Sequence, residues 1–329
     1  LYTPNANANG SVTFNVTVID DGGTSNSGDD RRTYSNAFTL TVNSVNDAPV
    51  LTDQSPDLRL NEDPGGGDTG MTISSLLVSG SVLETNDNVS PGTSTDNTAY
   101  EAIAITGTSV SAGTLQYSLD GGSSFADVGA VSNNSSLLLN SSDRLRLVSP
   151  TDYNGSAGTF TFRAWDQTTT ASGSSGNKVD TSTNGGTSEF SSFADTATIT
   201  VNAVNDEPTA SFQTPSAVNE DASGQTISSF ATPTNGATQL EGGQAFTYTV
   251  SRASGDSTSL FSVQPAISAN GTLTYTPNAN ANGSVTFNVT VIDDGGTSNS
   301  GDDRRTYSNA FTLTVNSVND APVLTDQSP

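Results

Sequence analysis

The stretch GSVTFNVTVIDDGG, residues 10–23, alternates apolar and polar side chains and then ends in an acidic, glycine-rich turn. Such alternation buries one face of a β-strand and leaves the other face in water. Similar runs recur at residues 244–250, 259–263, 271–276, 284–292 and 307–316, joined by Gly, Asn and Asp turns. No helical period of useful length accompanies them. The pattern predicts an all-β fold of tandem immunoglobulin-like sandwich modules, each with about seven strands.

The chain also contains a long internal repeat. Residues 2–56 return without a single change as residues 275–329, at an offset of 273 positions. Sandwiches of one architecture need share only a pattern, so identity that extends through surface loops indicates a recent or homogenised duplication. We expect the chain to be part of a longer array, with modules arranged as beads along a stalk or filament. A duplicated tail on an otherwise unique protein, or a single closed barrel, would be the alternatives.

Closing phrases that end in Asn-Asp divide the chain into modules. The Asn-Asp pairs that end these phrases lie at residues 46–47, 205–206 and 319–320. The predicted divisions are 1–47, the C-terminal part of a truncated module; 48–206, a long module; 207–320, a short module that is the complete copy of the 1–47 type; and 321–329, the start of the next long module. The long module differs mainly by insertions at 86–97 and 172–186, which are predicted surface loops.

Composition restricts the classes of function. Ten basic and 34 acidic residues give a net charge of −24, which repels nucleic acid and anionic headgroups. The sequence has no Cys and no His, which removes disulfides, thiolate chemistry and most zinc sites. No run approaches the roughly 18 apolar residues of a membrane span. An apolar fraction of 32% suits small sandwiches with modest cores, and the regular alternation argues against the alternative of disorder.

Acidic residues fall where linkers are expected. In an immunoglobulin-like sandwich the first turn lies beside the following linker and the last long loop lies beside the preceding linker. Residues 61–63 (Asn-Glu-Asp) occupy such a first turn, residues 293–294 (Asp-Asp) such a last loop, and residues 205–206 the linker between them. Calcium binds about six to eight oxygens, carboxylates included, in irregular geometry. The sequence therefore predicts a Ca²⁺ site at each junction.

The predicted metal ligands form three sets. The complete junction is expected to use Glu62, Asp63, Asn205, Asp206, Asp293 and Asp294, with Asp152 from a neighbouring corner; the first junction keeps Asn46, Asp47 and Asp166, and the last keeps Glu220, Asp221, Asn319 and Asp320. Without a cation, carboxylates about 4 Å apart repel by about 1 kcal/mol per pair, so the ion-free linker is expected to bend. The alternative is that these side chains cap turns through local hydrogen bonds.

At the level of these phrases the chain resembles the cadherin-like tandem modules of giant bacterial surface adhesins, which are related to VCBS-type repeats. Residues 293–296 (Asp-Asp-Gly-Gly), a strand, and residues 318–322 (Val-Asn-Asp-Ala-Pro) are similar to the cadherin sequence of acidic loop, strand and Asn-Asp linker. Residues 61–63 and 219–221 are similar to the Glu-bearing phrase near the first cadherin strand. Departures in the linker favour one or two ions over three. The resemblance implies export to the bacterial cell surface and a role in adhesion or extracellular fibre building.

Three functions follow as hypotheses. The leading one is a structural, calcium-stiffened stalk or filament whose partners are other copies of the repeat. An adhesive or carbohydrate-binding module that engages a cell-surface or glycan ligand through its long loops is the alternative. A hydrolase needs only two acidic groups, but the acidic residues recur at the linkers and no His is present, so the chain is not expected to be an enzyme. Trp165 alternates with apolar neighbours and is interpreted as a packing residue.

Overall fold

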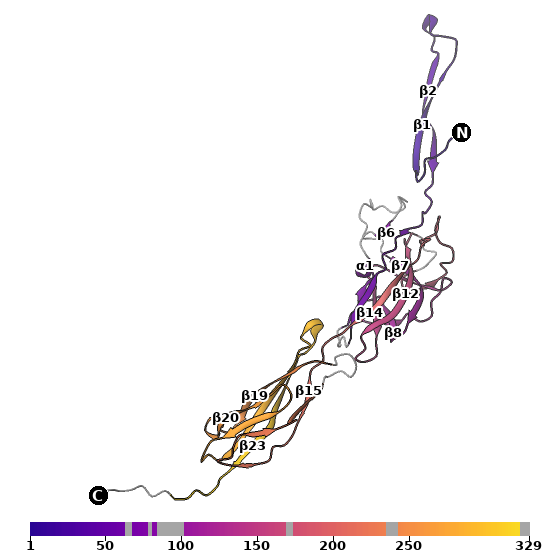
Figure 1. Cartoon of the computed structure of the whole chain (residues 1–329). Helices are drawn as coiled ribbons and strands as arrows, with labels where there is room; N and C mark the ends of the chain where they lie inside the picture. Colours follow the sequence, from indigo (N-terminus) through magenta and orange to yellow (C-terminus); the bar gives the residue numbers. More distant parts are fainter. Residues whose placement is uncertain (63–67, 78–80, 84–101, 169–173, 235–242, 323–329) are drawn as a thin grey trace. The chain divides into compact units, whose positions relative to one another are not determined.

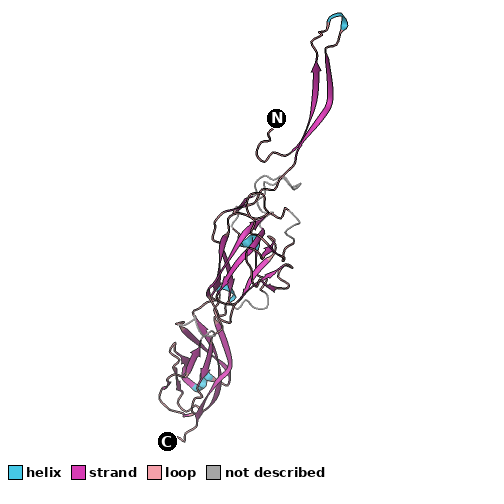
Figure 2. Cartoon of the chain, turned by 90° about the vertical axis from the view of Figure 1, so that its right-hand side faces the viewer, coloured by secondary structure: helices cyan, strands magenta, loops and turns pink. Residues whose placement is uncertain are grey.

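The structure is a computed structural model, and it describes residues 1–62, 68–77, 81–83, 102–168, 174–234 and 243–322. The chain divides into two compact units: residues 1–60, 64–150 and 155–201 form the first, and residues 61–63, 151–154 and 202–329 form the second. Strands dominate both units, as Figure 2 shows. The prediction of an all-β fold with several sheets is confirmed. Among the described residues, no helix combines the length and apolar character needed to cross a membrane.

The first unit begins with a two-stranded hairpin, drawn in indigo in Figure 1. Strand β1 (Gly10–Ile19) pairs antiparallel with β2 (Arg31–Val42), and the 3₁₀ turn η1 (Ser25–Ser27) lies in the connection. The register runs from Gly10 opposite Val42 to Ile19 opposite Arg31, with one irregularity after Phe14. Every residue of β1 is exposed, including the apolar ones.

Among the described residues, the rest of the first unit contains two larger sheets and a short pair of strands. The six-stranded sheet has the order β13 (Lys178–Val179), β10 (Ser136–Leu139), β7 (Ala102–Val110), β12 (Gly155–Trp165), β14 (Asp195–Asn202), β4 (Asp57–Asn61). The four-stranded sheet has the order β5 (Met71–Thr72), β11 (Arg144–Val148), β8 (Thr114–Ser118), β9 (Ala126–Asp127). Strand β3 (Val50–Leu51) pairs with β6 (Val82–Leu83), and α1 (Ile73–Leu76) is a single helical turn.

Alternation in sequence becomes alternation in burial in this unit. In β12, Phe160, Phe162 and Ala164 are fully buried while the residues between them are partly exposed. Strand β14 shows the same period of two. Trp165 is buried in a cluster with Phe190 and Leu138, which confirms its interpretation as a packing residue.

The second unit is a sandwich around one core. One sheet has the order β16 (Val218–Asn219), β23 (Arg304–Asn316), β22 (Gly283–Asp293), β19 (Phe246–Ser254), and the other has β17 (Gln225–Ile227), β21 (Leu273–Pro277), β20 (Phe261–Ile267); β15 (Thr209–Phe212) pairs with β18 (Ala231–Thr234). Phe261 and Tyr275 of the second sheet pack with Phe287 and Phe311 of the first. The 3₁₀ turn η3 (Ser298–Ser300) lies between β22 and β23.

Two local expectations are corrected by the structure. The run at 259–263 is not all strand, because α2 (Ser257–Leu260) forms a helical turn there, with Asp256 accepting hydrogen bonds from the N–H groups of Thr258 and Ser259. The insertion at 172–186 is not simply a surface loop. Its residues 178–179 form β13 at the edge of the six-stranded sheet, and Thr181 is fully buried and hydrogen-bonded to Ser136. The other insertion, 86–97, lies outside the described residues.

Candidate linker sites

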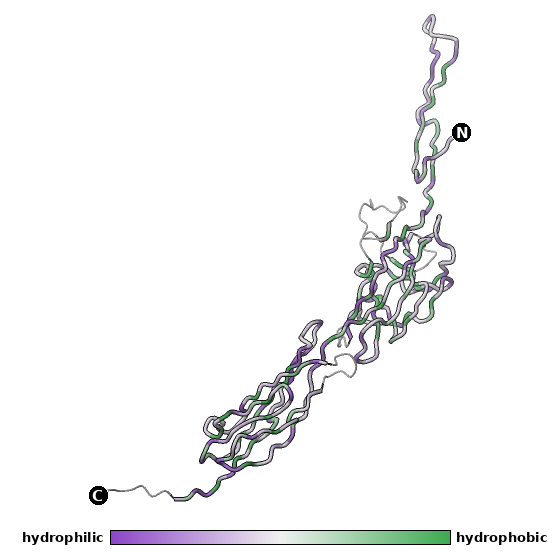
Figure 3. Tube along the Cα trace, viewed as in Figure 1, coloured by the Kyte–Doolittle hydropathy of each residue, from purple (hydrophilic) through white to green (hydrophobic). Residues whose placement is uncertain are grey.

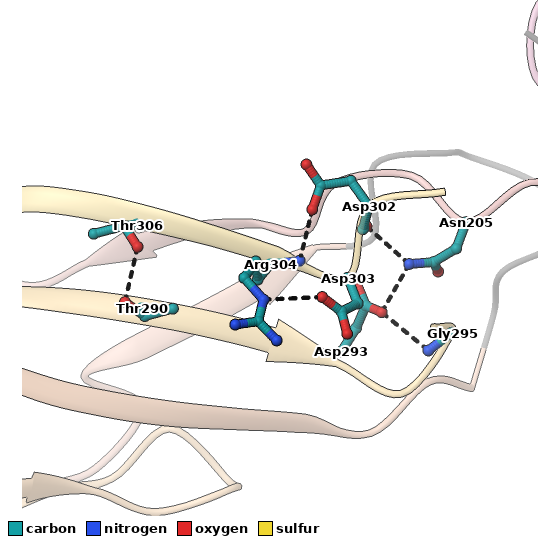
Figure 4. Close-up of polar contacts among 8 residues, drawn as sticks. All are labelled: Asn205, Thr290, Asp293, Gly295, Asp302, Asp303, Arg304 and Thr306. Carbon is teal, nitrogen blue, oxygen red and sulfur yellow. Dashed lines mark hydrogen bonds and ion pairs between the residues drawn. The ribbon is translucent and has the colours of Figure 1, made fainter. Parts of the chain in front are cut away.

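Asn205 is the centre of the candidate site in the second unit. Its Nδ2 donates to Asp293 Oδ1 at 3.0 Å and to the backbone carbonyl of Asp302 at 2.9 Å, as Figure 4 shows. Its backbone carbonyl accepts from the N–H of Asp302 at 2.9 Å. Asp293 ends β22 and Asp302 precedes β23, so Asn205 binds both sides of the loop between these strands. The linker is thereby fixed to the acidic loop of the module that follows it.

Two glycines let the linker approach this loop closely. A Cβ on Gly295 would lie 1.7 Å from Asn205 Oδ1, and one on Gly301 would lie 2.8 Å from the Asn205 carbonyl oxygen. Gly295 also donates its N–H to Asp293 Oδ1 at 3.0 Å. The Asp-Gly-Gly phrase therefore positions the carboxylate and leaves space for Asn205.

Two buried oxygens at this site lack a donor. Asp293 is 5% exposed, and its Oδ2 accepts no hydrogen bond from the residues that the structure describes. The same is true of Gln244 Oε1, while Gln244 Nε2 donates to Asn205 Oδ1 at 2.6 Å. An unpaired buried carboxylate oxygen is costly unless a donor or a cation satisfies it. The oxygen chemistry of this site fits a hard cation such as calcium.

The first unit repeats the linker contact with different neighbours. Asn46 Nδ2 donates to Asp166 Oδ2 at 2.9 Å and to the carbonyl of Ser188 at 3.0 Å. The other oxygen, Asp166 Oδ1, accepts from the N–H and the hydroxyl of Thr168 at 2.9 and 2.7 Å. Both carboxylate oxygens of Asp166 thus have donors, unlike those of Asp293.

Burial also changes the ionisation of this first site. Asp166 is fully buried, and burial raises its pKa, although hydrogen bonds from Asn46 and Thr168 oppose the shift. Burial raises the pKa of Glu189 as well, the hydrogen bond from Trp165 opposes the shift, and the negative charge of Asp166 raises it further. The two carboxylates therefore share an environment that disfavours their negative charge, and a bound cation would relieve that cost.

A second recurring contact holds the linker that follows each module. Glu62 is buried, and its Oε1 accepts from the N–H of Val204 at 2.7 Å. Glu220 is buried in the same way and accepts from the N–H of Val318 at 2.7 Å. An Asn side chain donates to each carboxylate as well, Asn154 to Glu62 at 3.2 Å and Asn282 to Glu220 at 3.4 Å.

Each of the remaining predicted ligands that the structure describes makes its own separate contact. Asp294 accepts from the N–H of Ala245, Asp221 accepts from the N–H of Asn280, and Asn319 donates to the carbonyl of Asp320. Asp47, Asp152 and Asp206 are also engaged in interactions, and Asp152 adopts a positive φ of 55°. Asp63 lies outside the described residues. Asp152 and Asp221 lie in turns, which fits the turn role that the sequence left open for such residues.

The predicted metal ligands were expected to cluster their carboxylates. Within the described ranges, no three acidic side chains are grouped so that they could hold a metal ion. The oxygens around Asp293 come instead from amides, which the sequence prediction included only as Asn205. Gln244, Asn154, Asn282 and Glu189 were missed. The repeated Asn-Gly-Ser phrase at residues 154–156 and 282–284 could have indicated the two Asn residues, whereas Gln244 and Glu189 are single residues without such a repeat.

Comparison with known proteins gives one family match. Residues 254–302 match the Bacterial Ig domain family, from the end of β19 through β22 and into the loop that contains the Asp293 site. No curated protein matches the sequence. The match supports an immunoglobulin-like module in the second unit.

Solved structures similar to the chain include cadherin ectodomains. Human mucin-like protocadherin EC1-2 is 13% identical, with 81% of this chain and 98% of that chain covered and a TM-score of 0.33. Human protocadherin-24 EC1-2 is 14% identical, with 82% and 98% covered and a TM-score of 0.39. An endo-fucoidan hydrolase of glycoside hydrolase family 107 is 15% identical, with 96% and 35% covered and a TM-score of 0.24.

Proposed function

We propose that this chain is a structural segment of a bacterial extracellular surface protein, in which sandwich modules are joined by fixed linkers into a stalk or filament for adhesion or matrix building. One observation carries the proposal: the same linker contacts occur twice. Asn46 and Asn205 bind the acidic loop of the module after them, and Glu62 and Glu220 bind the linker after them. A contact that recurs in two linkers favours a role in the connection between modules over a single ligand site. Other copies of the repeat are the expected partners.

The proposal includes calcium at the linkers. Asp293, Asn205 and Gln244 would hold the ion in the second unit, since their buried oxygens include two without donors. Asp166, Asn46 and Glu189 would hold it in the first unit, where burial raises both carboxyl pKa values. A bound ion would neutralise these carboxylates and stiffen the linker. The predicted ligands Asp63, Asp206 and Asp320 stay part of the proposal.

Calcium titration tests this directly. Binding to the folded state alone raises stability by about 2.7 kcal/mol when the free ion is at 100 times its Kd. We therefore expect a higher melting temperature in calcium than in chelator, with magnesium at equal ionic strength as the control. Equal melting temperatures in calcium, magnesium and chelator would contradict calcium binding and leave the sandwich repeat itself intact.

The proposed role is non-catalytic. The acidic side chains of both sites bind linker groups, and the chain lacks the His that would serve as a base at neutral pH. The Bacterial Ig domain match of residues 254–302 supports an exported module rather than an enzyme.

A further inference from the structure

The first and last segments of the second unit run in the same direction. Residues 205–220, the entry segment, lead into the module, and residues 302–318, the exit segment, lead out of it. Strand β16 pairs with the end of β23 in parallel, with Val218 opposite Val315. Because the two segments are parallel, the chain enters the module at one end of this contact and leaves it at the other end.

Contacts between the two segments keep one register along their length. The residues that they join are 97 or 98 positions apart: Asn205 with Asp302, Glu207 with Arg305, Ala210 with Tyr307, and Glu220 with Val318. A constant separation means that the segments stay aligned well beyond the two residue pairs of β16 and β23. Figure 3 shows hydrophobic residues recurring along the strands of this unit. The contacts between the segments add polar ties to that apolar core.

Glu220 forms the tie nearest the point where the chain leaves the module. Its backbone N–H donates to the carbonyl of Asn316 at 2.9 Å, and its carboxylate accepts from the N–H of Val318 at 2.7 Å. The side chain is 6% exposed. A hydrogen bond to a carboxylate is stronger than one between neutral groups, and breaking it here would leave a buried charge without this donor. The exit segment is therefore held firmly to the entry segment at this end.

The long module contains the same arrangement. Strand β4 is the neighbour of β14 in the six-stranded sheet. The residues joined along the two segments are 141 or 142 positions apart: Gln54 with Asp195, Asn61 with Asn202, and Glu62 with Val204. Glu62 takes the part of Glu220 and is 2% exposed. Two modules of different length thus keep the same contact between the segments that lead in and out.

We propose that these paired segments form a shear clamp, which is a contact that resists tension applied along the chain. Tension pulls the entry and exit segments in opposite directions along their common axis. Because the segments are parallel and their ties share one register, all the ties are strained together and do not open one after another. The source of the tension rests on the proposed stalk, whereas the clamp is a property of the contacts within a module and does not depend on calcium.

Pulling the full chain in two directions tests the proposal, and the absence of Cys allows a pair of thiol handles to be placed. Ala203→Cys with Asn319→Cys applies force along the clamp. Ala203→Cys with Thr297→Cys applies force across one end of it, where Asn299 Nδ2 donates to the Ala203 carbonyl at 3.4 Å. In chelator and at one pulling speed, the first pair should open at a force at least about twice that of the second, since forced unfolding follows the barrier to opening.

Two variants, pulled along the clamp, locate the tie. Glu220→Ala removes the acceptor of the Val318 N–H and should lower the opening force by at least about one third. Asp221→Gly is the matched control, because the neighbouring Asp221 carboxylate bonds the N–H of Asn280, outside both segments. Its positive φ of 62° suits Gly, so this variant should leave the force unchanged.

A second tie keeps the test decisive if Glu220→Ala does not fold. Tyr307→Phe retains the ring but removes the acceptor of the Ala210 N–H, and it should also lower the force along the clamp. Equal opening forces in the two pulling directions would overturn the proposal, and so would unchanged forces in both Glu220→Ala and Tyr307→Phe. Either result would leave calcium binding at the linkers untouched. Conversely, a melting temperature that ignores calcium would leave the clamp standing.

Discussion

At the scale of single residues, the Asn205 amide shows how one donor connects a linker to its module. Its two N–H groups reach a carboxylate and a carbonyl, both acceptors. In Asn205→Asp, an oxygen would replace this donor and face two other oxygens. Without calcium we expect a loss of about 2 kcal/mol of unfolding free energy in the second unit. Urea denaturation measures it.

A matched control is available in the chain. Asn319 occupies the same Val-Asn-Asp phrase but is exposed and donates to the neighbouring Asp320 carbonyl. Asn319→Asp should therefore change stability by less than about 0.5 kcal/mol. Calcium should restore part of the loss in Asn205→Asp, because a cation satisfies three oxygens as an amide cannot. An unrestored loss would favour a purely hydrogen-bonded linker.

Asp256 gives a prediction of pH dependence. Hydrogen bonds from the side chains of Thr258 and Ser259, and then from their N–H groups, lower its pKa from 3.8 to about 2. A depressed carboxyl pKa contributes stability that is fully present above the unfolded value and is lost as pH falls through the folded value. The urea midpoint of the wild type should exceed that of Asp256→Ala at pH 6, and the gap should close between about pH 4 and pH 2. A gap independent of pH would contradict the cap.

At the scale of elements, the two turns that flank β8 allow the cost of backbone strain to be measured apart from the cost of steric overlap. Gly113 and Gly121 have positive φ values of 88° and 76°. A Cβ on Gly113 would lie 2.3 Å from the Val148 carbonyl oxygen, whereas one on Gly121 would meet nothing within 4 Å. Gly121→Ala should cost about 1 kcal/mol, and Gly113→Ala about 3 kcal/mol. Equal losses of unfolding free energy would refute the overlap.

The edge strand β13 yields another prediction. Thr181 is fully buried and bonds both Ser136 Oγ and the Asn133 carbonyl. Thr181→Val removes these hydrogen bonds at constant size and should cost about 1–3 kcal/mol in thermal or urea unfolding. Thr183→Val, two residues away and exposed, is the control and should be nearly neutral. If both variants are neutral, the segment is a surface loop after all.

Some of these strands could be predicted from the sequence and others could not. The strands β19, β21, β22 and β23 were predicted because their apolar period of two is long and regular. Strand β13 was not predicted, because this segment is held by hydroxyl and backbone groups and its composition is typical of a loop. At the candidate site, the linker Asn and the loop Asp were named from their positions in the module, and the structure places them in contact; their role as metal ligands stays a prediction. The amide partner Gln244 was not named, since its role depends on a contact distant in sequence.

At the scale of the whole molecule, the 273-residue period predicts a fibre repeat. A sandwich with strands of about 17–20 Å, with its loops and linker, should extend about 35–50 Å. Two modules in one period then give an axial rise of about 70–100 Å. Fibre diffraction or electron microscopy of assembled material measures this rise. A repeat of half that length would show that the long and short modules are equivalent in the fibre.

The identical hairpins have a consequence for folding order. Along the sequence, residue 277 is connected to β22 through residues 278–282, whereas β2 is connected to residue 205 through residues 43–204. Each doubling of a connecting loop costs about 0.6 kcal/mol of loop-closure free energy. Pairing with the nearer hairpin is therefore favoured, but the difference in free energy between the two pairings grows only slowly with loop length. Tandem repeats are prone to misassembly between like partners. In the proposed array, alternating each copy with a different module would keep identical sequences apart and would reduce pairing between the wrong copies.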